Sequence, residues 1–124
     1  MEINDNFFNT DESLAALCTL IKDATNLEHV SIDSSDIDDE ERTKQVMEAL
    51  VETQSKDTLY SFNWSYDAFE QDDFIEELLG LLGNGLFTVL EFVELAETMD
   101  DKKKRNKWRN TYKEKGISLI LSDR

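Results

Sequence analysis

The chain has 124 residues, of which 28 are Asp or Glu and 13 are Lys or Arg, giving a formal net charge of −15. Hydrophobic residues make up 40 % of it, too many for a disordered acidic tail, and its length suits a single domain over residues 1–124. No apolar run approaches the roughly 20 residues that cross a bilayer, and the N-terminus lacks the pattern of a secretory signal. Cys18 is the single cysteine and cannot form an internal disulfide. We therefore expect a soluble, cytoplasmic protein.

The charge is divided unevenly along the chain. Residues 1–100 carry a net charge of −21, whereas residues 101–124 carry +6. An acidic body of this density repels nucleic acid and anionic membranes, and it attracts basic proteins over a long range. We therefore expect a basic protein partner, with no direct binding to nucleic acid and no membrane contact.

The first expected helix begins near Asn9 or Thr10, either of which can cap it. Asp11 and Glu12 follow in the first turn, where negative charge suits the helix dipole. Apolar residues then recur at helical spacing, at Leu14, Leu17, Cys18 and Ile21. Because Cys18 lies on this stripe, we predict a buried core thiol.

The middle of the chain alternates between strand-like and helix-like spacing of its apolar residues. Glu28–Ile32 and Thr58–Trp64 alternate as strands do, and the second is expected to place Tyr60, Phe62 and Trp64 on one face. A second helix is expected to begin at Ser35 or Asp36, and a third at about Asp72.

The C-terminal third opens on the turn signal Gly83-Asn84-Gly85. Leu86–Leu95 suits a strand, which we prefer, although its apolar positions also permit a helix. Asp100–Lys115 is a basic helix with Trp108 and Tyr112 as its docking edge, and Gly116 ends it. Ile117–Leu121 is nearly continuously apolar, which is typical of a strand buried on both faces.

The predicted fold is a single layered α/β domain in which helices alternate with about four short strands. Alternation favours a largely parallel sheet, with an α+β arrangement as the alternative. The basic C-terminal helix is followed by a buried strand, and no internal repeat is apparent.

Residues for catalysis or metal binding are sparse. His29 is the only histidine, without a second histidine or a Cys-x-x-Cys pair to share a metal, and we interpret it as structural or exposed. A calcium loop starting at Asp36 would need glycine and glutamate where the chain has Glu41 and Met47. No glycine-rich phosphate loop is present. The sequence therefore predicts no catalytic residue, no metal site and no cofactor.

The basic helix is the main counter-argument, because isolated it would look like a nucleic-acid-binding element. Its charged residues are Lys102, Lys103, Lys104, Arg105, Lys107 and Arg109. We prefer the interpretation that the helix lies over the sheet with these bases facing acids of the same chain, since the field of the acidic body is screened only beyond about 10 Å.

The best candidate site interleaves aromatic and acidic residues directly after a strand. Acidic segments rich in Trp and Tyr suit the capture of Lys and Arg side chains through ion pairs and cation–π contacts. If the strands at 28–32 and 58–64 are parallel, the acids that follow each of them emerge at one edge of the sheet. The predicted partner-binding residues are Trp64, Tyr66, Asp67, Glu70, Asp72 and Asp73 together with Asp33, Asp36, Asp38 and Asp39.

These features favour a non-enzymatic acidic protein that neutralises a basic partner by covering its active or nucleic-acid-binding surface. In size, charge and lack of catalytic residues the chain resembles bacterial immunity proteins and antitoxins that occlude a nuclease toxin domain. The alternative is a nucleic-acid mimic or regulatory adaptor of a cellular nucleic-acid-binding protein. A small enzyme, or a nucleic-acid binder acting through the 102–115 helix, is a third hypothesis.

Overall fold

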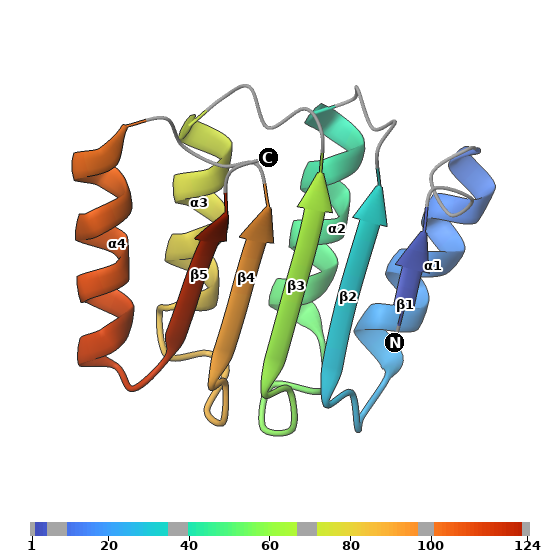
Figure 1. Cartoon of the computed structure of the whole chain (residues 1–124). Coiled ribbons are helices and arrows are strands. Elements are labelled where there is room, and N and C mark those ends of the chain that lie inside the picture. Colours follow the sequence, from blue (N-terminus) through green and yellow to red (C-terminus); the bar gives the residue numbers. More distant parts are fainter. Residues whose placement is uncertain (1, 5–9, 35–39, 67–71, 97–100, 123–124) are drawn as a thin grey trace.

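The computed structural model describes residues 2–4, 10–34, 40–66, 72–96 and 101–122 (Figure 1). Within them, strands and helices alternate along the chain, which confirms the predicted α/β class. The elements are β1 (Glu2–Asn4), α1 (Asp11–Asp23), β2 (His29–Ser34), α2 (Glu40–Glu52), β3 (Ser61–Tyr66), α3 (Asp72–Leu82), β4 (Phe92–Ala96), α4 (Lys102–Glu114) and β5 (Ser118–Ser122).

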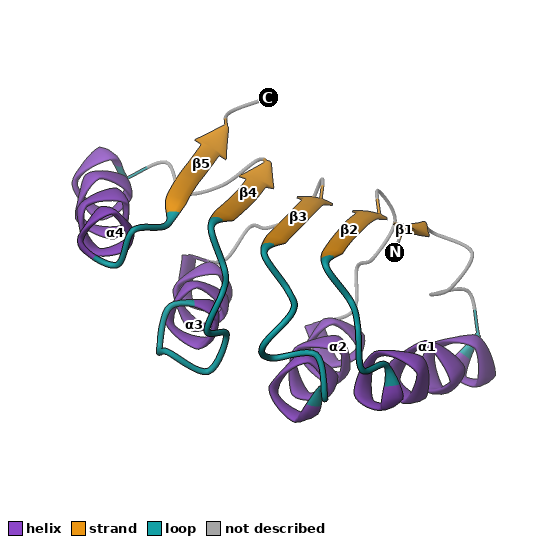
Figure 2. Cartoon of the chain, turned by 90° about the horizontal axis from the view of Figure 1, so that it is seen from below, coloured by secondary structure: helices purple, strands orange, loops and turns teal. Residues whose placement is uncertain are grey.

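The strands form one five-stranded sheet in the order β1-β2-β3-β4-β5, and every neighbouring pair is parallel. Each strand from β1 to β4 is therefore followed by a helix and then by its own neighbour in the sheet. Crossovers of one hand place successive helices on the same side of such a sheet. Figure 2 shows this arrangement: α1 to α4 lie in a row along one side of the strands, and none of the described helices lies on the other side.

Successive β-α units occupy equivalent positions, so the fold is a short solenoid. The loops between units are joined by hydrogen bonds of nearly constant sequence separation: Thr53 Oγ1 donates to the carbonyl of Ile21, 32 residues away, and Ser55 Oγ to that of Ala24, 31 residues away. The prediction that the chain has no internal repeat is therefore wrong for its structure. Solenoids of this kind are stabilised by contacts between neighbouring units.

The core lies between the sheet and the row of helices. Alternate residues of the strands face it, namely Val30, Ile32, Phe62, Trp64, Val93, Leu95, Leu119 and Leu121, all of them buried. The predicted stripe of α1 contributes Leu14, Leu17 and Ile21, which are also buried. Cys18 is only partly buried against this core, and burial raises the pKa of its thiol.

Local signals account for the helix ends. Thr10 caps α1, its hydroxyl accepting a hydrogen bond from the backbone N–H of Ser13, and the Asp101 carboxylate caps α4 in the same way. Gly116 has a φ of +75°, the left-handed conformation that glycine adopts readily after a helix. Thr10 and Gly116 lie where the sequence predicted the start of α1 and the end of α4, whereas α4 begins at Lys102, two residues after the predicted Asp100.

Three strand predictions need correction. Tyr60 precedes β3 and is 46 % exposed, so it does not share the buried face of Phe62. The segment Leu86–Leu95 contains a strand, as preferred, but only from Phe92 onward. Finally, β5 is not buried on both faces: it is an edge strand, and Ile120 is 39 % exposed on the side without helices.

Candidate functional site

The carboxyl ends of β2 and β3 lie side by side. The strands pair in parallel, with Asp33 opposite Ser65 and Ser34 opposite Tyr66. The acid-rich segments that follow these strands therefore begin at adjacent points of the same sheet edge, as the sequence predicted. Figure 1 shows both strands ending at this upper edge.

The predicted binding residues fall into three groups. Tyr66 and Asp33 belong to the ends of β3 and β2, and Asp72 and Asp73 open α3. The remaining acids lie outside the described residues: Asp36, Asp38, Asp39, Asp67 and Glu70. The structure thus places the strands and the helix that flank this acidic surface.

Trp64 is the exception, and it has to be removed from the predicted surface. Its exposed fraction is 0 %, and its indole packs edge-to-face against Phe62, with ring centroids 6.2 Å apart. The residue alternates with the outward positions of β3 and so faces the helices. A side chain in the core cannot contact a partner, so the Trp64 anchor is wrong.

A surface that the sequence analysis missed lies on the helix-free side of the sheet, which we call the open face. Parallel sheets usually have both faces covered, and their strands are then apolar throughout. Here the positions that alternate with the core residues are mostly small or polar. They are His29, Ser31, Ser61, Asn63, Phe92, Glu94, Ser118 and Ile120.

The described strands contribute no Lys or Arg side chain to the open face. None of the five strands contains either residue. Near its centre, Asn63 Nδ2 on β3 donates to Glu94 Oε2 on β4 at 3.3 Å, and both side chains are half-buried. The charge of Glu94 is therefore held in place by an amide and is not neutralised within the sheet.

A second polar pair joins β2 and β3 on the same face. His29 Nδ1 lies 2.8 Å from Ser61 Oγ, within hydrogen-bond distance. A Ser–His contact is one part of a nucleophilic site, but Ser61 is only 8 % exposed. We interpret the pair as a cross-strand contact that orients the imidazole. Among the described residues, no group of three or more His, Cys, Asp or Glu side chains is arranged to hold a metal ion.

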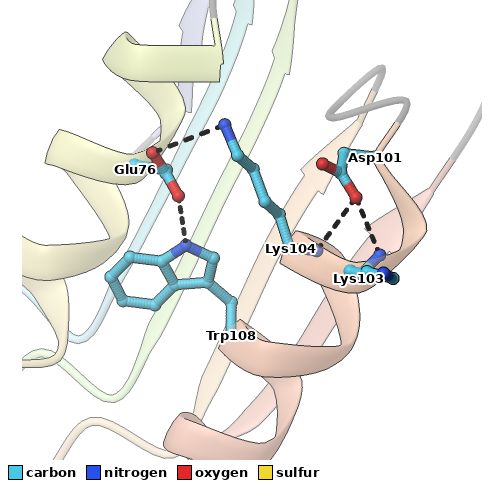
Figure 3. A network of polar contacts seen from close by, with 5 residues as sticks. All are labelled: Glu76, Asp101, Lys103, Lys104 and Trp108. Atoms are coloured by element: carbon cyan, nitrogen blue, oxygen red, sulfur yellow. Dashed lines mark hydrogen bonds and ion pairs between the residues drawn. The ribbon is translucent and has the colours of Figure 1, made fainter.

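The basic helix α4 packs against β5 at one end of the helix row. Trp108 Nε1 donates to Glu76 Oε1 on α3 at 3.3 Å, and Lys104 Nζ lies 4.0 Å from the other oxygen of the same carboxylate (Figure 3). Tyr112 is fully buried, and its hydroxyl donates to the carbonyl of Leu79 at 2.5 Å. The predicted docking edge of Trp108 and Tyr112 is therefore confirmed.

The bases of α4 only partly follow the expectation that they face acids of their own chain. Lys104 does so through Glu76, and Arg109 instead donates to the main-chain carbonyl of Leu121 at 3.1 Å. Four other bases are exposed and make no ion pair within the described part of the chain: Lys102, Lys103, Lys107 and Lys113. A charged outer surface on the last helix of a solenoid suits a solvated end.

The open face could have been recognised from the sequence by the polar residues at every second position of the strands, such as Ser31, Asn63 and Glu94. A strand covered on both sides would not carry them.

No described helix is long and apolar enough to cross a membrane. Comparisons of the chain with protein-family models, with curated proteins and with solved structures give no match.

Proposed function

We propose that this protein is a non-enzymatic binding protein that neutralises a basic protein partner by covering its active or nucleic-acid-binding surface. The closest functional description is that of an immunity protein or antitoxin directed at a nuclease domain. The partner docks at the carboxyl edge of the sheet and on the adjoining open face, where its Lys and Arg side chains meet carboxylates.

The observation that carries the proposal is the separation of charge in the fold. The five described strands contain no Lys or Arg, and acid-rich segments follow β2 and β3 at neighbouring points of one edge. The exposed surplus of bases belongs to α4, at the end of the helix row. A surface of one sign steers a partner of the opposite sign and raises its association rate.

The test uses the basic protein recovered with this chain from its native host, after purification of both. The triple variant Asp67→Lys, Glu70→Lys and Asp72→Lys reverses the acidic edge. A matched variant, Asp11→Lys, Glu12→Lys and Asp23→Lys, makes the same change in net charge on α1. We expect the edge variant to lose binding by about a hundredfold or more, and the α1 variant to change only the association rate, by less than about tenfold.

Two further readouts decide the class of partner. The association rate should fall steeply as salt rises, and the partner's nuclease activity should stop at one equivalent of inhibitor. Equal losses in the two triple variants would show that only net charge matters and would contradict the proposed surface. Comparable binding to several unrelated nucleic-acid-binding proteins would favour the adaptor instead.

A further inference from the structure

The most distinctive point on the open face is an acidic side chain beside an aromatic one. Glu94 and Phe92 are two residues apart on β4 and therefore share a face, about 6.6 Å apart along the strand. Both are half-buried, so each has a fixed surrounding and a surface open to solvent. Asn63 from the neighbouring strand holds one oxygen of the Glu94 carboxylate.

We infer that Glu94, Phe92 and Asn63 form a recognition point for an arginine side chain of the basic partner. The inference rests on the proposed function and names the group that this part of the surface takes. Asn63 occupies Glu94 Oε2 at 3.3 Å, which leaves Oε1 to accept N–H groups from an incoming guanidinium. Phe92, two residues away on the same face of β4, offers an aromatic ring on which a guanidinium can stack.

Charge complementarity identifies the occupant as cationic. An opposite-charge cross-strand pair would stabilise the sheet, and here the cross-strand partner of the carboxylate is a neutral amide. None of the described strands supplies a Lys or Arg, so no base within the sheet itself neutralises Glu94, and an incoming cation finds a charged acceptor there. A planar guanidinium fits better than an ammonium, since it can stack on Phe92 and bond the carboxylate at once.

The neighbouring residues allow such an approach. Ile120 lies beside Glu94 in the register of β4 and β5 and is 39 % exposed, so it offers apolar surface for the methylene groups of the arginine. Ser118 lies beside Phe92 and is small and exposed. The small Ser118 side chain therefore leaves Phe92 accessible from the side of β5.

The test measures the binding of a seven-arginine peptide and a seven-lysine peptide to the full chain, by calorimetry and by amide chemical shifts. The Glu94→Gln variant keeps the shape of the side chain but removes its charge, and it should weaken the binding of the arginine peptide by about tenfold. The matched control is Glu91→Gln, which removes the same charge from an exposed position just before β4 and should change binding less than about twofold. Phe92→Leu should bring the affinities of the two peptides within about twofold of each other.

The outcomes separate this inference from the proposed function. Equal effects of Glu94→Gln and Glu91→Gln, or shifts confined to residues away from β4, would overturn the recognition point. In that case an edge variant that still loses the native partner leaves the proposed function standing. If Glu94→Gln weakens the peptide while no basic protein from the host binds, the recognition point stands and the proposed function fails.

Discussion

Two glycines near the end of α3 should respond in opposite directions to the same substitution. A Cβ on Gly83 would lie 2.9 Å from Cε1 of Tyr112 and 3.2 Å from the carbonyl oxygen of Leu79. Neither neighbour can move freely, because Tyr112 is fully buried and its hydroxyl is bonded to that same carbonyl. On Gly80, the nearest atom is Cη2 of Trp108 at 4.0 Å, an ordinary contact.

The magnitudes follow from these distances. Overpacking should make Gly83→Ala less stable by about 1–3 kcal/mol. Gly80→Ala should gain up to about 1 kcal/mol, since alanine is the better helix former in a helix interior. For a chain of this length, 1 kcal/mol corresponds to about 4 °C in Tm. Urea unfolding followed by tryptophan fluorescence measures both, and a Gly83→Ala variant as stable as the wild type would refute the packing argument.

Two further predictions concern buried hydroxyl groups. Thr53→Val should lower the free energy of unfolding in urea by about 1–3 kcal/mol, because the Thr53 hydroxyl is buried and donates to a main-chain carbonyl at 2.6 Å. Thr88→Val removes an exposed hydroxyl and should lower it by under about 1 kcal/mol. Equal losses in the two variants would contradict the role of burial. Burial raises the pKa of the Tyr112 hydroxyl, which favours its neutral form in the folded state. The stability that depends on this neutral hydroxyl is therefore present in full below the unfolded pKa of about 10 and is lost as pH rises further. Tyr112→Phe should cost about 1 kcal/mol at pH 7, because the hydrogen bond to Leu79 is lost. The difference in unfolding free energy between Tyr112→Phe and the wild type should become smaller above a pH of about 10. A difference that stays constant with pH would argue against the raised pKa of Tyr112.

The helices were predictable because their signals are local. Thr10 with the following acids fixed the start of α1, and Gly116 marked the end of α4. The three-residue strand β1 was missed because Glu2–Asn4 is too short to show a pattern. The predicted start of β3 was too early, because Tyr60 has a residue type common in strands but lies in the loop before Ser61.

The order of the strands depends on contacts between units, which no single segment reveals. A weak signal was nevertheless present: a leucine stands three residues before the first buried strand residue at Leu27, Leu59 and Leu90. This recurrence predicts equivalent units placed side by side. Polar residues at alternate strand positions signal an uncovered face, but its extent across the sheet follows only once the described helices are known to lie on one side. For that reason the adjacency of the β2 and β3 carboxyl ends was predictable, whereas the position of Glu94 on the open face was not.

The hydrogen bond from Arg109 to the Leu121 carbonyl has a consequence for behaviour at high concentration. A bare outer strand invites another chain to add to it, and such additions lead to fibres and precipitates. Arg109 occupies an acceptor that an invading strand would need, and the lysines of α4 repel the same helix of another copy. The helix that completes the core thus also disfavours the addition of further strands at the edge of the sheet.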